Sequence, residues 1–258
     1  MDGFDLVLLT ALGVGGATVI GALIGFLFKN PSKRFSDMIL SFAAGVMLSA
    51  AVIGLIIPSI ELNTAKAPIK LIVTVGGIIA GAVSLNLIDR LVPHLHKITG
   101  VDIEAHPHKT AELNKVLLFV IAIAIHNLPE GIAAGVSFGS ENTTHALVVA
   151  GGIALQNIPE GMVIIAPMIS SGMTKKRTFL IALSTGLVEV VGTLIGYFAV
   201  SAASFILPFA LAFAGGTMLY VISDEMIPET HSNGNERLAT YALLVGFSVM
   251  LAFDFLIG

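Results

Sequence analysis

Long runs of hydrophobic residues, separated by short polar segments, make up most of the chain. Residues 6–28, 38–60 and 71–88 contain no charged side chain. Each run is close to the roughly 20 apolar residues that an α-helix needs to cross a bilayer. The longest run, 178–223, is expected to form two helices that separate near 201–208. The pattern predicts eight transmembrane helices in a single domain, at about 5–28, 37–60, 68–91, 115–139, 145–170, 178–200, 203–227 and 237–257.

The predicted fold class is therefore an all-α polytopic membrane protein, and the composition agrees with it. Only 12% of the 258 residues are charged, whereas soluble domains carry about 25%, so a soluble enzyme is excluded. The net charge of −4 is too weak to indicate a nucleic-acid partner, and the absence of cysteine excludes thiolate metal sites. Because the N-terminus carries acids where a secretory signal has bases, no cleavable signal peptide is expected.

Lysine and arginine are unevenly distributed between the two sets of predicted loops. Eleven of the 13 lie in the first, third, fifth and seventh loops, and only Lys66 and Lys70 lie in the others. Because positive charge collects in cytoplasmic loops, we expect a multi-pass protein of the cell membrane with both termini outside. The third loop, about 92–114, either collects released metal or is simply hydrated; it carries His94, His96, His106 and His108.

Two of the predicted helices repeat one polar motif. Residues 126–131 read HNLPEG and residues 156–161 read QNIPEG. In each copy the first residue and the glutamate are four apart, which puts them on one face of a helix. Each proline also frees the carbonyl four residues earlier. Since a charge at the bilayer centre costs about 2.5–3.5 kcal/mol on insertion scales, these polar residues are candidates for function.

The spacing of the two copies predicts an inverted repeat. Their helices run antiparallel and are joined near Asn142, so the motifs lie within roughly 3 Å of the same depth at about 1.5 Å rise per residue. Matching motifs on antiparallel helices imply a twofold pseudo-axis in the membrane plane, as in inverted-repeat transporters. The alternatives for these residues are a buried histidine bonded to a carbonyl and protonated glutamates that link helices. Imidazole, amide and carboxylate groups, with Glu189 at a similar depth, suit zinc, iron(II), manganese or cadmium.

The paired N-x-P-E-G motifs, the eight spans and the histidine-bearing third loop resemble the ZIP (Zrt-/Irt-like protein) family of divalent-metal transporters, in its prokaryotic GufA/ZupT-type branch. The resemblance extends over the whole chain and implies an intramembrane centre that binds two metal ions. It also implies uptake of divalent metal, chiefly zinc, into the cytoplasm, with no resident cofactor. Gln156 stands where a histidine is common in the family. The first ion is placed at His126, Glu130, Gln156 and Glu160, and the second at Asn127, Asn157, Glu160 and Glu189.

Further residues are candidates for the transport pathway. By resemblance, Met47 lies near the first ion and Glu61 attracts ions outside, although a methionine on an apolar helix is also explained by packing. The cytoplasmic candidates form either an exit for the ion or a hydrated helix end: Asp89, Glu225, Glu229 and His231. Alternating access is expected from helices one to three and six to eight rocking about helices four and five. The expected partners are the metal ion and the lipid bilayer, with a homodimer left open.

Two functions of other classes compete with metal transport. An intramembrane metallohydrolase would need an open coordination position and usually an HExxH helix, and that motif does not occur in the sequence. A proton channel would use the carboxylates but would not need the amides around them. We therefore expect a carrier and not an enzyme.

Overall fold

The computed structural model describes residues 3–28, 31–91, 124–140, 142–170 and 172–258, and within these ranges every regular element is a helix. The third loop with its four histidines and the start of the fourth predicted helix lie outside the described residues. The side chain of Asp89 lies outside them as well.

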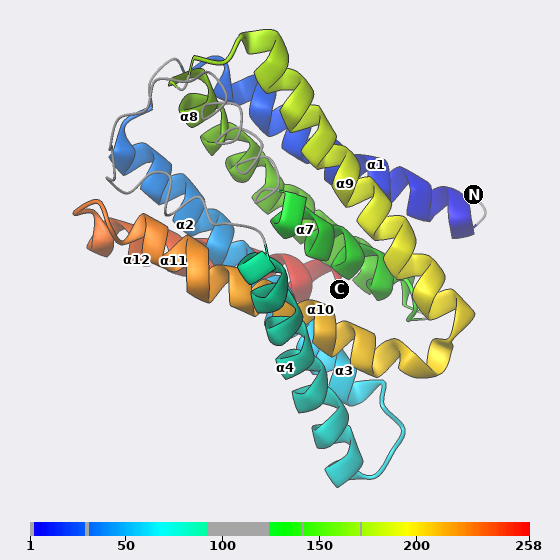
Figure 1. Ribbon diagram of the computed structural model, residues 1–258. Coiled ribbons are helices and arrows are strands. Elements are labelled where there is room, and N and C mark those ends of the chain that lie inside the picture. Colours follow the sequence, from blue (N-terminus) through cyan, green and yellow to red (C-terminus); the bar gives the residue numbers. More distant parts are fainter. Residues whose placement is uncertain (1–2, 29–30, 92–123, 141, 171) are drawn as a thin grey trace.

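Seven helical segments in the described ranges are long and apolar enough to cross a membrane (Figure 1). An eighth helix is described over residues 124–137. The prediction of an all-α polytopic membrane protein is confirmed at this level. The elements in chain order are α1 (Gly3–Gly25), α2 (Lys33–Ser49), η1 (Ala50–Ile56), α3 (Ile57–Glu61), α4 (Ala67–Leu91), α7 (Thr143–Val163), α8 (Ile165–Ser170), α9 (Lys175–Ala202), η2 (Ser204–Ile206), α10 (Leu207–Val221), η3 (Ile222–Met226), α11 (Ile227–Thr230) and α12 (Glu236–Ile257).

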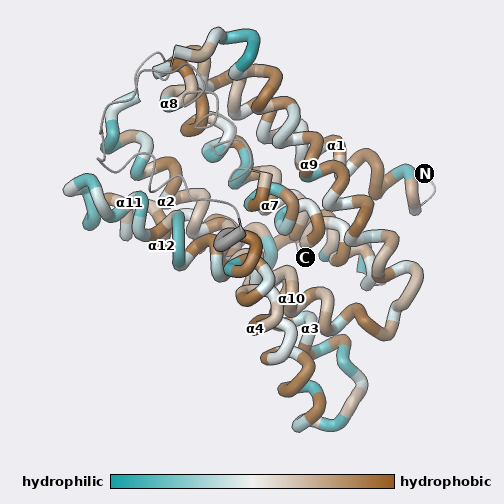
Figure 2. Tube along the Cα trace, in the orientation of Figure 1, coloured by the Kyte–Doolittle hydropathy of each residue, from teal (hydrophilic) through white to brown (hydrophobic). Residues whose placement is uncertain are grey.

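The surface of the bundle is apolar over the length of its helices. Large hydrophobic side chains such as Leu71 and Ile72 on α4 and Leu244 and Val245 on α12 are exposed. Figure 2 shows hydrophobic residues along the helices and hydrophilic residues at the turns between them, with a further hydrophilic patch inside α7. An exposed apolar surface of this extent is unfavourable in water, so it indicates contact with lipid. Both termini lie on the side of the bundle opposite the turn at 231–235 (Figure 1).

The helices pack in two groups that do not follow their order in the chain. In the first group α1 packs against α7 and α9; in the second, α10 packs on α4 and α12 packs on α2. The contact between α2 and α7 joins the groups. The expectation that helices one to three and six to eight rock about helices four and five stays a prediction; in this structure α1 packs against the motif helix α7 and against α9.

Glycines bring the helices of the first group into backbone contact. A Cβ atom on Gly15 of α1 would lie 2.2 Å from the carbonyl oxygen of Gly186 on α9, and one on Gly186 would lie 2.4 Å from that of Gly15. Small residues allow such close crossings in membranes, where packing and not hydrophobic burial holds helices together. Side chains at either glycine would therefore force α1 and α9 apart.

The glycine that ends each repeated motif makes the same kind of contact. A Cβ on Gly161 of α7 would lie 2.2 Å from the carbonyl oxygen of Thr18 on α1, and one on Gly131 would lie 2.3 Å from that of Glu189 on α9. The backbone of α7 is therefore in direct contact with α1, and that of the 124–137 helix with α9. The Glu130 side chain, one residue before Gly131, interacts electrostatically with Glu189.

The second group contains a matching pair of contacts. A Cβ on Gly81 of α4 would lie 2.2 Å from the carbonyl oxygen of Phe213 on α10, and one on Gly246 of α12 would lie 2.0 Å from that of Phe42 on α2. The pairs α4–α10 and α2–α12 are thus packed alike, and each joins one helix from the first half of the chain to one from the second half.

Two membrane helices contain a π-helical stretch followed by an Ile-Pro pair. In η1 and η3 the last backbone bonds span five residues, from the Ile57 N–H to the Val52 carbonyl and from the Ile227 N–H to the Ile222 carbonyl. Pro58 and Pro228 come next and lack the N–H that an α-helix would use. Such π-bulges insert an extra residue into a helix and are frequent at functional sites.

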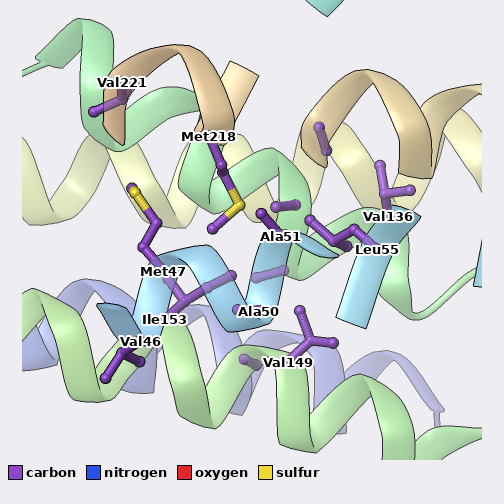
Figure 3. Packing of buried hydrophobic residues seen from close by; sticks show 14 of the residues in the cluster. Val46, Met47, Ala50, Ala51, Leu55, Val136, Val149, Ile153, Met218 and Val221 are labelled. Atoms are coloured by element: carbon purple, nitrogen blue, oxygen red, sulfur yellow. The ribbon is translucent and has the colours of Figure 1, made fainter. Parts of the chain in front are cut away.

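A cluster of buried apolar side chains fills the space between the two groups. It includes Met47 and Leu55 from the α2–η1 segment, Val149 and Ile153 from α7, and Met218 from α10 (Figure 3). Met47 is almost fully buried in this cluster. Its surroundings here are those of a packing residue.

Candidate functional site

Most polar residues of the two motifs are buried, in the first half of the 124–137 helix and toward the end of α7. Asn127 and Glu130 come from the first helix and Gln156 and Asn157 from α7, and all four are buried, as is Glu189 from α9. Five buried polar side chains in one group of membrane helices are costly unless they have partners. Their hydrogen bonds divide them into two halves.

The Glu189 carboxylate forms the first of these halves, and it accepts three hydrogen bonds. Its Oε1 accepts a bond from Thr18 Oγ1 at 2.6 Å and another from Asn127 Nδ2. Its Oε2 accepts a bond of 2.6 Å from Asn157 Nδ2, which also donates to the Val14 carbonyl at 3.3 Å. Bonds to an ionised carboxylate are short and strong. This half of the site therefore keeps a carboxylate in place without any ligand.

The other half consists of Glu130 and Gln156, and its polar atoms lack partners. Among the described residues, no atom lies in hydrogen-bond geometry with either buried carboxylate oxygen of Glu130 or with either buried amide atom of Gln156, although Gln156 is close enough to the Glu130 carboxylate to interact with it. Asn157 Oδ1 and one oxygen of Glu160 are in the same state. Nearly all buried polar atoms in proteins are hydrogen-bonded, so a group of buried oxygens without partners indicates a binding site. Carboxylate and amide oxygens are ligands for divalent cations.

Glu160 connects the two halves. It interacts electrostatically with His126, with Glu130 and with Glu189. Among the residues that the structure describes, no three His, Asp or Glu side chains are arranged as a metal site by themselves. A cation held here would therefore also use amide oxygens.

His126 points toward the second group of helices. Its Nε2 lies 2.7 Å from Oε2 of Glu225 in η3, and the two side chains are 22% and 16% exposed. Glu225 was expected at the cytoplasmic exit for the ion. The structure instead brings it into direct contact with the motif histidine.

The remaining pathway candidates lie away from these contacts. Glu61 is exposed at the end of α3 and Glu229 is exposed in α11. The ring nitrogens of His231 lie 2.9 Å from the Ile227 carbonyl and 3.1 Å from Thr240 Oγ1. His231 thus joins the end of α11 to α12.

Comparison with known proteins identifies the family. The family model described as "ZIP Zinc transporter" matches residues 99–254, which include both motifs and Glu189. The chain belongs to the ZIP family. It is 39% identical to the zinc transporter GufA of Myxococcus xanthus over 97% of this chain and 98% of the relative. It is 36% identical to the zinc transporter ZIPB of Bordetella bronchiseptica, over 94% of this chain and 78% of the relative. It is 33% identical to the zinc transporter ZupT of Streptococcus mutans, over 96% and 95% respectively.

The ZIP family is one of membrane transporters and not of enzymes, which agrees with the expected class. The structure adds residues that the sequence analysis missed. Thr18 is one of two threonines in an apolar run, and the only sequence signal for it is the pattern G-x2-T-x2-G-x3-G that begins at Gly15. The same pattern, with glutamate in place of threonine, begins at Gly186 and contains Glu189.

Asp37 near the start of α2 was also missed. Its buried carboxylate accepts hydrogen bonds from Asn233 Nδ2 at 3.0 Å and from Asn235 Nδ2 at 2.9 Å. These bonds fix the turn between α11 and α12 to α2. No periodicity or motif in the sequence indicates this contact.

Proposed function

We propose that this ZIP protein carries zinc ions across the cell membrane into the cytoplasm, through a centre that binds two ions. The observation that carries the proposal is the cluster of buried oxygens of Glu130, Gln156 and Glu160 that lack hydrogen-bond partners. The names of the relatives, all zinc transporters, support zinc as the chief substrate. Iron(II), manganese and cadmium suit the same ligands.

In this proposal the two halves of the site each bind one ion. His126, Glu130 and Gln156 bind the first ion, Asn127, Asn157 and Glu189 bind the second, and the Glu160 carboxylate bridges them. The electrostatic contacts of Glu160 with both halves support this role. Binding the first ion requires His126 to exchange the Glu225 carboxylate for the metal.

We further propose that the chain is an inverted repeat, in which the first three and last three helices correspond. The matching contacts of Gly161 with Thr18 and of Gly131 with Glu189 support this relation. So do the two π-helical stretches that precede Ile-Pro pairs in the second and seventh spans. Alternating access then follows from movement of the group that holds the motifs against the group of α2, α4, α10 and α12.

The proposed route begins outside, where both termini lie. Glu61 attracts the cation there, Met47 lies along the way, and the ion leaves through the acids and histidine near η3: Asp89, Glu225, Glu229 and His231. The excess of lysine and arginine at the opposite ends of the helices supports this orientation. A homodimer is compatible with the exposed apolar faces.

The experiment is zinc uptake into liposomes that contain the purified protein. We expect wild-type protein to accumulate zinc and Glu160→Ala to abolish accumulation, because that carboxylate is assigned to both ions. Glu236→Ala serves as the matched control, since Glu236 is an exposed acid at the start of α12. Near-normal uptake by Glu160→Ala would refute the two-ion centre, and proton flux without any metal dependence would indicate a proton channel instead.

A further inference from the structure

Thr18 is the donor to Glu189 that belongs to neither repeated motif. Its hydroxyl is 3% exposed and donates to Glu189 Oε1 at 2.6 Å, from α1 to α9. The two other donors that the structure assigns to this carboxylate are the amides of Asn127 and Asn157. Both amides are proposed ligands of the second ion, whereas Thr18 has not been assigned any role.

The bond made by Thr18 differs from those of several other buried threonines in the bundle, although Thr74 also bonds to a side chain outside its own helix, the Ser59 hydroxyl. The hydroxyls of Thr185, Thr193 and Thr217 donate to carbonyl oxygens three or four residues earlier in their own helices. Such bonds satisfy the hydroxyl locally and involve no other helix. Thr18 instead crosses to another helix and reaches a carboxylate. A purely packing role would not require this bond.

The place of Thr18 in the chain gives a second, independent observation. It occupies in α1 the position that Glu189 occupies in α9, within the matching glycine patterns that start at Gly15 and Gly186. Those two glycines contact each other at the crossing of the helices. At this crossing α9 therefore carries the Glu189 carboxylate and α1 carries the Thr18 hydroxyl, and the hydroxyl donates to the carboxylate.

We propose that Thr18 is the positioning residue of the second ion site, and this inference rests on the proposed function. When the amide oxygens of Asn127 and Asn157 turn to the ion, their N–H groups leave the carboxylate, and the Thr18 hydroxyl remains as its donor. A carboxylate oxygen has two lone pairs. Thr18 holds one of those on Oε1 and thereby directs the other toward the ion.

The test compares three variants in equilibrium zinc binding and in zinc uptake by liposomes. Thr18→Val keeps the shape and removes the hydroxyl, Thr18→Ser keeps the hydroxyl, and Thr185→Val is the control for loss of a buried hydroxyl one turn from Glu189. We expect Thr18→Val to weaken the binding of one of two ions about tenfold or more, since a hydrogen bond to a charged group is lost. We expect Thr18→Ser and Thr185→Val to bind both ions nearly as the wild type does.

The outcomes separate this proposal from the function on which it rests. In uptake, Thr18→Val should raise the zinc concentration for half-maximal rate more than it lowers the maximal rate. If the wild type takes up zinc and Thr18→Val binds both ions as tightly as the wild type does, the positioning role alone is overturned. Equal loss in Thr185→Val, or no rescue by Thr18→Ser, would also overturn it. A wild-type protein that neither binds nor transports zinc would overturn both proposals.

Discussion

The two halves of the candidate site contain similar residues but are built in opposite ways. Glu189 accepts three hydrogen bonds, from Thr18, Asn127 and Asn157. For Glu130, which is equally buried, no atom of the described residues lies in hydrogen-bond geometry, although the Gln156 amide is beside it. The Glu189 half is thus held together by hydrogen bonds of the folded protein, whereas the buried oxygens of the Glu130 half are available to a ligand. Burial of an unpartnered carboxylate destabilises the fold, so this half is expected to be kept for its function.

The largest difference between the halves is expected in transport. Glu130→Gln should lower zinc uptake about 100-fold or more, because a direct ligand loses its charge, and Glu189→Gln about tenfold. Initial rates in liposomes at matched protein content measure both. Equal effects of the two substitutions would show that the halves contribute alike to the ion's path.

The second difference concerns the free energy of unfolding of the metal-free protein, and here the halves should differ in sign. Glu189→Gln should destabilise by about 1–3 kcal/mol, because an amide has one acceptor oxygen for three donors. Glu130→Gln should leave stability unchanged or raise it, since it removes an unpartnered buried carboxylate. Thermal unfolding in detergent with a chelator is the measurement.

The same samples provide the control for that comparison. Added zinc should raise the unfolding temperature of the wild type and of Glu189→Gln, but hardly that of Glu130→Gln. A destabilised Glu130→Gln protein would mean that Glu130 has partners in the metal-free state.

The smallest effect is expected from Gln156→His, which would make the two motifs chemically alike. An imidazole is a stronger ligand for zinc than an amide oxygen. Zinc should therefore bind several-fold more tightly and gain relative to manganese and iron(II), while maximal uptake stays level or falls because the ion must also leave. Competition uptake with the three metals measures this. Unchanged ion preference would show that residue 156 is not a ligand.

Much of the helical architecture could be predicted, because an uncharged run of about 20 residues has few alternatives to a membrane helix. The candidate residues could also be named, since the motif at His126 recurs at Gln156. Their partners could not be predicted. Thr18 is one hydroxyl in an apolar run, and the pair of His126 with Glu225 depends on how two distant helices pack.

The grouping of the helices could not be predicted from the sequence, for a similar reason. Hydrophobic runs reveal which segments enter the membrane but not which of them touch. Which helices touch depends on close backbone contacts at Gly15, Gly161 and Gly186, where a side chain would collide with the facing helix. A glycine on a lipid-facing surface, such as Gly76, looks the same in the sequence.

The π-helix η3 determines the direction in which Glu225 points, and therefore whether its carboxylate contacts His126. Its closing bond runs from Ile227 to Ile222, five residues apart, so the segment holds one residue more than an α-helical turn. Each residue of an α-helix turns the chain by about 100°. Deleting one residue, such as Ser223, would therefore rotate Glu225 by about that angle about the helix axis and take its carboxylate away from His126. His126 and Glu225 would both still be present, but their contact would be lost because the backbone between the helix ends is one residue shorter.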